Sequence, residues 1–313
     1  MSRNGLRSSG ALLLAVLCLS PAMTAAAATP RARGAGPAVM RASKTGTTAA
    51  KQRHVRRRSG RRAPPGGVVW ARNAIVLDPA TDAILYEKNA GTSAPCASLT
   101  KLMTALVFLE QRPDFTRNVE VTNAELRGGG HTQLRPGERV LIGDLLHMSL
   151  MCSDNAATRV IVRESGVSLE DYLSQMNKRA AELELADTRF VECTGLDEHN
   201  VSTATDVAKL LRAAADHETI RSISTTRKYE FRTARRSHFI GNTNRLLYSH
   251  YEILGGKTGF INEAGYCLAT WVRSEGRDVI AVVLGAPTNA TRFADVVRMM
   301  QKTTKPTFAP TQN

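Results

Sequence analysis

Acidic residues are absent from the first quarter of this 313-residue chain, and the first one is Asp78. The same stretch holds 14 of the 42 lysines and arginines, so the remaining 28 basic residues face all 28 acidic ones. The formal net charge of +14 therefore belongs to the N-terminal region, and the rest of the chain is formally neutral. A nucleic-acid-binding domain usually carries its basic residues on the folded part. The charge distribution therefore argues against nucleic acid as a partner.

The spacings typical of metal sites are also missing. The seven histidines show no metal-ligand spacing, and the five cysteines form no C-x-x-C pair. We therefore expect no metal and no cofactor. The apolar run at the N-terminus, residues 11–19, is too short for a comfortable transmembrane helix.

The N-terminal region has the pattern of an export signal. Arg3 and Arg7 precede the apolar run, and the small residues 24–28 follow it. We expect residues 1–28 to be a signal peptide cleaved near Ala28, with an uncleaved anchor as the alternative. The protein is then expected in the periplasm or at the cell wall.

Residues 29–66 are rich in Arg, Ala, Gly, Thr and Pro and cannot bury enough apolar surface to fold. We expect a disordered basic linker that serves as a solvated tether. The alternative is an electrostatic contact with anionic wall polymer or lipid headgroups. The expected catalytic domain is residues 67–313.

Strand patterns occur at both ends of this domain, with helical patterns between them. An antiparallel sheet that joins the two ends and is flanked by helices fits this order, which is an α+β fold with a mostly helical subdomain inserted. Hairpins are expected over 74–87 and 266–284, and turn-rich loops with short strands over 112–140. Helices are expected from Ser98 onward and over 142–151, 169–185, 204–214 and 291–301.

Three short motifs follow one another along the domain: Ser98-Leu99-Thr100-Lys101, Ser153-Asp154-Asn155 and Lys257-Thr258-Gly259. Each is weak alone, but their order is typical of enzymes that transfer an acyl group to a serine. An apolar helical period follows Ser98, so this serine lies on a first turn, near free N–H groups and the positive dipole end. Lys101 lies three residues on, on the same helix face. The alternative is that Ser98 only caps a helix and Lys101 is a surface charge.

No histidine lies near the motifs in a triad-like pattern, so the base that activates Ser98 has to be Lys101. A lysine acts as a base only when it is neutral. Burial and the nearby charge of Lys257 are both expected to lower the pKa of Lys101. We expect Ser153 to relay the proton to the leaving nitrogen.

Residues 70–300 resemble the low-molecular-mass penicillin-binding DD-peptidases. The segment 97–104 is similar to that family's nucleophile segment, and further similar segments are 188–190, 194–196, 200–203, 242–244 and 263–268. The resemblance implies a β-lactamase/DD-transpeptidase-like fold. It is nearest to the DD-endopeptidase branch, because the larger carboxypeptidases carry a further β-domain and an anchor helix for which no residues remain. Three cysteines depart from the family pattern: Cys96, Cys152 and Cys193.

The resemblance also implies roles for the motif residues. Ser98 carries the acyl group, and Asn155 holds the substrate's backbone amide and steadies Lys101. Lys257 and Thr258, followed by Gly259, bind the carboxylate beside the scissile bond. The backbone N–H groups of Ser98 and Phe260 form the oxyanion hole. The implied substrates are peptidoglycan stem peptides ending in D-Ala, cut by a carboxypeptidase or an endopeptidase reaction, and the implied inhibitors are β-lactams.

Two other functions remain open from the sequence. A serine β-lactamase uses the same motifs, and Glu192 and Glu198 lie in the stretch that would supply its water-activating carboxylate, but the usual spacing to Asn is absent. A non-catalytic wall-binding module is the other. A disulfide between Cys152 and Cys193 is also an option, whereas Cys267 fits a buried apolar position in a strand.

Overall fold

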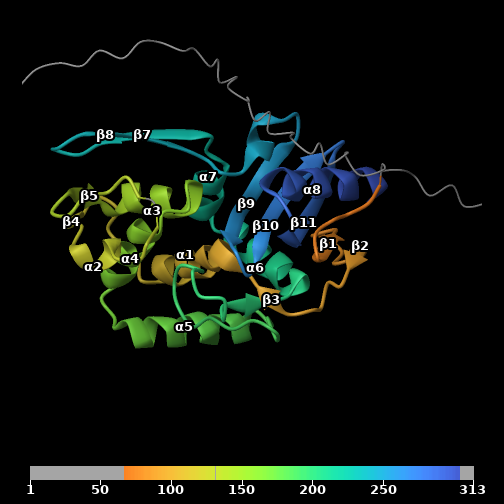
Figure 1. Cartoon of the computed structure of the whole chain (residues 1–313), viewed down its shortest axis with the longest axis horizontal. Coiled ribbons are helices and arrows are strands. Elements are labelled where there is room, and N and C mark those ends of the chain that lie inside the picture. The colour runs from red at the N-terminus through yellow and green to blue at the C-terminus, as the bar shows by residue number, and fades with distance from the viewer. Residues whose placement is uncertain (1–66, 131, 304–313) are drawn as a thin grey trace, which may run out of the picture. The chain divides into compact units, whose positions relative to one another are not determined.

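A five-stranded antiparallel sheet lies beside the helical part of the domain (Figure 1). The computed structural model describes residues 67–130 and 132–303. The expected signal peptide 1–28 and linker 29–66 lie outside the described residues, so both stay predictions. No helix in the described ranges combines the length and the apolar character needed to span a bilayer.

The sheet joins the two ends of the domain, as the sequence predicts. Its strand order is β2-β1-β11-β10-β9. Strand β1 is buried on both faces because an apolar core lies on each side of the sheet, and Ile75 pairs with Val282 of β11. The five strands are β1 (Asn73–Leu77), β2 (Ile84–Lys88), β9 (Glu252–Ile261), β10 (Gly265–Ser274) and β11 (Arg277–Ala286).

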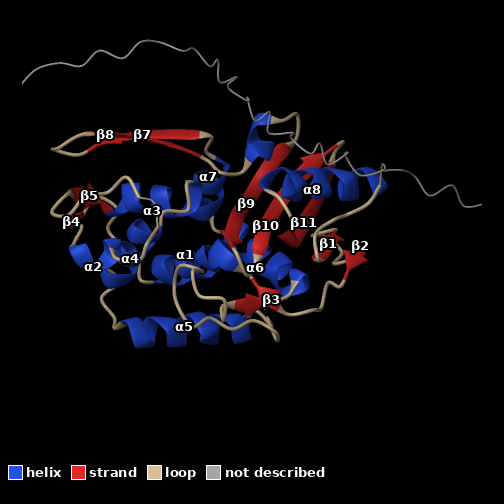
Figure 2. Ribbon diagram, viewed as in Figure 1, coloured by secondary structure: helices blue, strands red, loops and turns tan. Residues whose placement is uncertain are grey.

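Each face of the sheet has its own apolar core because side chains alternate along the strands. Ala74 and Val76 of β1 belong to the cluster that contains the buried face of α8 (Asn289–Thr303). Ile75 belongs to the larger cluster, which contains α6 (Ala204–Asp216) and the rest of the helical part. Figure 2 shows the sheet between these layers. The predicted α+β architecture is confirmed.

The helical part is built around α1 (Thr100–Glu110). All of its residues except Glu110 are buried, so it has no polar face, as expected for a helix surrounded by others. This position places Lys101 in the interior. Helices and short strands around α1 come from the stretch between the sheet strands: β4 (Asn118–Glu120), α2 (Asn123–Leu126), β5 (Arg139–Leu141), α3 (Ile142–Met151), α4 (Asn155–Arg163) and α5 (Leu169–Glu182).

A hairpin that the sequence analysis did not predict lies beside α3 (Figure 1). It consists of β7 (Lys228–Arg232) and β8 (Ser237–Gly241). The Tyr229 hydroxyl donates to Asp144 of α3, with 2.7 Å between the oxygens, and the Tyr229 ring stacks on His147. The remaining elements are β3 (Ala94–Pro95), η1 (Ala97–Leu99), β6 (Val201–Ser202), α7 (Glu218–Thr225) and η2 (Arg245–Tyr248).

Candidate active site

Ser98 lies in the 3-10 turn η1, directly before α1. The preceding Ala97 is buried and has a φ of +48°, a conformation that costs an alanine free energy. Two contacts hold it there. Thr100 Oγ1 donates to the Ala97 carbonyl at 2.8 Å, and Gly195 packs so closely on the Ala97–Ser98 peptide that a Cβ at Gly195 would overlap it. The backbone at the candidate nucleophile is therefore held from outside its own turn.

The amine of Lys101 is fully buried and contacts three oxygen atoms. Its Nζ lies 3.0 Å from Ser98 Oγ, 2.7 Å from Asn155 Oδ1 and 2.6 Å from the Thr194 carbonyl. No carboxylate of the described residues lies within ion-pair distance of it. Burial lowers the pKa of Lys101 to about 8, which the negative charge of Glu192 only partly opposes. About one tenth of the amine is therefore neutral at pH 7.

These contacts determine where the lone pair of a neutral Lys101 points. A neutral amine has two hydrogens and one lone pair. The Thr194 carbonyl can only accept a hydrogen bond, and Asn155 Oδ1 is also an acceptor, because Asn155 Nδ2 donates to the Gly129 carbonyl at 2.8 Å. The two hydrogens are thus taken, and the lone pair is left facing Ser98 Oγ.

Asn155 is the first residue of α4, and Ser153 lies just before that helix. Asp154 caps the helix, since its Oδ1 accepts from the Ala157 N–H at 3.0 Å. Ser153 has a φ of +64°, an uncommon conformation for a serine that ends α3 and lets α4 start in a new direction. The buried Ser153 Oγ has no hydrogen-bond partner among the described residues. It is therefore available to a bound molecule.

Lys257 is buried in β9. Its Nζ donates to the Thr258 carbonyl at 2.9 Å, and Thr258 Oγ1 lies 2.6 Å from Thr243 Oγ1. Burial lowers the pKa of Lys257 well below its usual value, and the charge of Lys101 lowers it further. No carboxylate of the described part of the chain pairs with this lysine. An anionic group that reaches it would favour its charged form.

Gly259 allows β9 to lie directly against the nucleophile turn. A Cβ at this position would be 3.1 Å from Ser98 N and 3.2 Å from the Cys96 carbonyl. Arg292 Nη1 donates to the Gly259 carbonyl at 3.0 Å. In a planar trans peptide the following N–H points the opposite way. The Phe260 N–H is therefore directed away from Arg292.

The structure thus joins Ser98, Lys101 and Asn155 by hydrogen bonds and packs Gly259 against Ser98. The charge of Lys101 lowers the pKa of Lys257, whereas the pKa of Lys101 itself is lowered by burial. Thr258 follows Lys257 in β9, and Ser153 Oγ has no hydrogen-bond partner among the described residues. The Phe260 side chain is exposed and packs on Tyr266. Sequence reasoning missed the Thr194 carbonyl, which has no side-chain signal. It also missed Arg292, whose only signal is its spacing on the buried face of α8.

Glu192 was considered from the sequence as a water-activating carboxylate. In the structure its carboxylate instead accepts hydrogen bonds from the loop of residues 194–196. Its Oε2 accepts from the N–H and the hydroxyl of Thr194 at 2.7 and 2.6 Å, and its Oε1 accepts from the Leu196 N–H at 2.9 Å. Gly195 N–H and Asn200 Nδ2 also donate to Oε1. The other candidate, Glu198, is exposed. Neither carboxylate contacts Ser98 or Lys101.

All four cysteines of the described residues are free thiols, so the Cys152–Cys193 disulfide is not formed. Cys152 Sγ donates to the Met148 carbonyl of its own helix at 3.2 Å, which directs it along α3. Cys267 is buried, as expected for its strand position. Within the described ranges, no three His, Cys, Asp or Glu residues are grouped so that they could hold a metal.

Three features occur together here: the turn that carries Ser98, the contact between Lys101 and Ser98, and the five-stranded sheet. They are typical of enzymes in which the substrate acylates an active-site serine. Residues 60–288 match the family Peptidase S11, D-alanyl-D-alanine carboxypeptidase. The chain belongs to this family of serine-type D-Ala-D-Ala peptidases.

Named relatives agree with this assignment. The chain is 34% identical to the D-alanyl-D-alanine endopeptidase of Escherichia coli K12 over 72% of this chain and 75% of that protein. It is 32% identical to the D-alanyl-D-alanine carboxypeptidase DacF of Bacillus subtilis over 74% of this chain and 61% of that protein. The crystal structure of the Streptomyces K15 DD-transpeptidase is similar, with a TM-score of 0.72, 27% identity, and coverage of 76% of this chain and 98% of that chain.

The first prediction concerns the glycine behind the nucleophile. In Gly195→Ala the new Cβ has to push the Ala97–Ser98 peptide, because the backbone there cannot move out of its way as a flexible side chain would. A displacement of about 1 Å costs on the order of 100-fold in rate. We expect at least that loss in the labelling of Ser98 by a fluorescent penicillin, measured by stopped-flow.

Gly166→Ala is the matched control. Gly166 has a φ of +87°, close to the +85° of Gly195. A Cβ at Gly166 would have no atom within 4 Å. Both variants should lose about 1–2 kcal/mol of stability from the left-handed backbone, measured by denaturant unfolding. Equal labelling rates in the two variants would show that Gly195 does not position Ser98.

Proposed function

We propose that this chain is a serine D-Ala-D-Ala peptidase that cleaves peptidoglycan stem peptides through an acyl-enzyme on Ser98. The observation that carries the proposal is the environment of Lys101. Its Nζ lies 3.0 Å from Ser98 Oγ, and its other two contacts are oxygens that accept hydrogen bonds. Such an amine, with its pKa lowered to about 8, is suited to remove the serine proton.

Acylation then follows from the positions of the groups. Neutral Lys101 takes the proton from Ser98 Oγ while the oxygen attacks the carbonyl carbon of the penultimate D-Ala. The negative charge that develops on the carbonyl oxygen is held by the N–H groups of Ser98 and Phe260. One such donor lowers the barrier by about 3–4 kcal/mol. Arg292 supports the second donor because it fixes the carbonyl of the same peptide unit.

The bond to the leaving amine breaks next. The nitrogen needs a proton, and we assign the relay of the Lys101 proton to Ser153, whose buried hydroxyl has no partner of its own in the described residues. In the hydrolysis of the acyl-enzyme, water takes the place of Ser98 as the attacking group. A water molecule loses a proton to neutral Lys101 as it attacks the ester carbon. The bond between that carbon and Ser98 Oγ then breaks, and Lys101 returns the proton to Ser98 Oγ.

Lys257 would bind the carboxylate next to the scissile bond, together with Thr258. A buried amine without an acidic partner gains most from an anionic ligand. A terminal D-Ala offers its own carboxylate, and a D-Ala–diaminopimelate cross-link offers the carboxylate on the D-centre of the leaving amine. Both the carboxypeptidase and the endopeptidase reaction therefore fit this subsite, and the named relatives include both activities.

We also propose that the protein is exported and works at the cell wall, where its substrate lies. The support is the sequence pattern of residues 1–28, with Arg3 and Arg7 before an apolar run. The basic residues of 29–66 would serve as a tether or as a contact with anionic wall polymer or lipid.

Acylation by benzylpenicillin tests the proposal directly. We expect the mass of the protein to increase by that of one penicillin, with the adduct on the peptide that contains Ser98. Ser98→Ala should carry no adduct, whereas Ser93→Ala, a change of an exposed serine nearby, should react as the unchanged protein does. An adduct that is still found in Ser98→Ala would contradict the assignment of Ser98 as the nucleophile.

Defined muropeptides complete this test. Released D-Ala from pentapeptide monomers reports the carboxypeptidase reaction, and split cross-linked dimers report the endopeptidase reaction. Neither product, together with binding to sacculi, would favour a wall-binding module. Fast turnover of nitrocefin would favour a β-lactamase.

The pH dependence of acylation gives the second test of the mechanism. Only neutral Lys101 accepts the serine proton, and its pKa in the folded protein is about 8. The acylation rate should therefore rise about tenfold per pH unit below that value and level off above it. A rate that is flat between pH 6 and 8, measured by stopped-flow with a chromogenic β-lactam, would contradict Lys101 as the base.

A further inference from the structure

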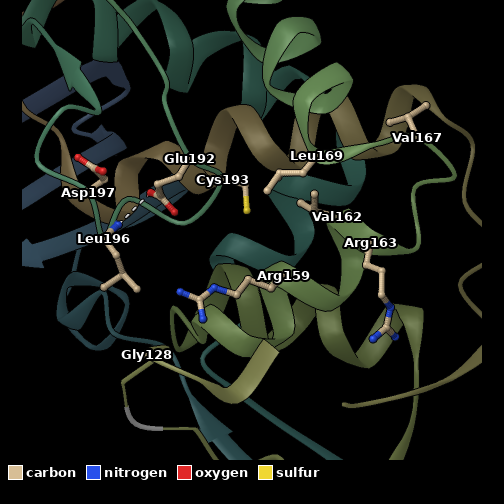
Figure 3. A pocket seen from close by; sticks show the side chains of 10 residues that line it. All are labelled: Gly128, Arg159, Val162, Arg163, Val167, Leu169, Glu192, Cys193, Leu196 and Asp197. Atoms are coloured by element: carbon tan, nitrogen blue, oxygen red, sulfur yellow. Dashed lines mark hydrogen bonds between the residues drawn. The ribbon is translucent and has the colours of Figure 1, made fainter. Parts of the chain in front are cut away.

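Figure 3 shows the side chains that line a pocket of about 670 Å³. Two of its walls are loops, of which one contacts Asn155 and the other contacts Lys101. One contains Gly128, next to the Gly129 carbonyl that holds Asn155. The other contains Cys193 and Leu196, on either side of the Thr194 carbonyl that holds Lys101. The pocket is therefore continuous with the elements that surround Ser98.

The third wall is helix α4, which presents Arg159 to the pocket. Arg159 follows Asn155 by four residues, so both lie on the same helix face, about 6 Å apart along its axis. An extended peptide advances about 3.3 Å per residue. For a peptide that runs along α4, Arg159 would lie about two residues further on than Asn155.

Arg159 is held in position without having its charge neutralised. Its Nη1 donates to the carbonyls of Glu125 and Arg127 at 3.2 and 2.6 Å, at the end of α2. No carboxylate in residues 67–130 and 132–303 lies within ion-pair distance of its guanidinium. In Figure 3 the guanidinium points toward the side where Leu196 and Gly128 lie.

The other charged groups around the pocket already have partners. Arg163 pairs with Glu125 and Glu164, and its guanidinium points away from that of Arg159 (Figure 3). The Glu192 carboxylate accepts the loop N–H groups, and the Asp197 carboxylate contacts His199 at 2.8 Å. Arg159 is therefore the lining cation whose charge is free to bind a ligand.

The uncharged part of the lining is apolar. Val162, Leu169, Cys193 and Leu196 contribute to it, and both leucines are exposed, at 55% for Leu169 and 37% for Leu196. Burial raises the pKa of the Cys193 thiol to about 12, so this cysteine lines the pocket as a neutral group. A pocket whose uncharged walls are apolar and whose one unpaired charge is a cation fits a short aliphatic segment that ends in a carboxylate.

We propose that this pocket is a subsite for the acyl-donor peptide, in which Arg159 binds a carboxylate carried two or three residues before the scissile bond. The proposal rests on the proposed function, because it needs a peptide bound with its scissile bond at Ser98. Lys257 would then recognise a carboxylate on the leaving side and Arg159 one on the donor side. The enzyme would select donor strands that are free acids over strands that are amidated.

Peptide binding to the Ser98→Ala protein tests the proposal without requiring turnover. Two peptides ending in D-Ala-D-Ala are compared, identical except for Glu or Gln at the second or the third residue before the scissile bond. We expect the acidic peptide to bind about tenfold more tightly at one of these positions. In Arg159→Gln the preference should disappear, and in Arg159→Lys part of it should return.

Arg163→Gln is the matched control, since it removes a charge from the same helix and the same pocket, and it should keep the preference. No preference in the Ser98→Ala protein, or an equal loss of affinity for both peptides in Arg159→Gln, would overturn the proposal. If Arg163→Gln lost the preference for the acidic peptide as fully as Arg159→Gln, the proposal would also be overturned. The preference would then come from the net charge of the pocket and not from Arg159.

A further control uses Arg159→Gln in a protein that keeps Ser98. Penicillin should still acylate Ser98 in this variant, because the proposed catalytic groups are unchanged. Loss of the peptide preference can then be told apart from a failure of the proposed function.

Discussion

The hydrogen bonds of one buried amine constrain most of the active-site structure. Lys101 needs two acceptors besides Ser98, and these come from distant parts of the chain, Asn155 on α4 and the carbonyl of Thr194. Burial of α1 removes the water that would otherwise favour its charged form. The helical part of the domain therefore determines both the direction of the lone pair and the fraction of Lys101 that is neutral.

The sheet supplies the second half of the site. Gly259 lets β9 approach the nucleophile turn, and Arg292 from α8 holds the carbonyl of Gly259 from the other side. Because both cores of the domain contribute, one around α1 and one under α8, the site depends on the packing of the helical part against the sheet. The strained backbone at Ala97 and Ser153 lies where these parts meet around the reacting atoms.

Much of this could be predicted from the sequence because the information is local. The spacing of Ser98 and Lys101 predicts a shared helix face, and β-branched runs predict β10 and β11. Contacts made by the backbone could not be predicted in this way, and the Thr194 carbonyl is one. Arg292 and Arg159 were also missed, because an arginine on a helix carries no sign of which distant carbonyls will face it. The β7–β8 hairpin was missed because its strands are short and three of the five residues of β7 are charged.

The central claim is that Lys101 is partly neutral near physiological pH. Carbon-13 NMR of lysine labelled at Cε measures this directly, with Lys101→Arg used to assign the resonance. We expect a titration midpoint near 8 for Lys101 in the folded protein. A midpoint near 10.5, the value of an unperturbed lysine, would contradict the account, because the amine would then be charged whenever the enzyme works.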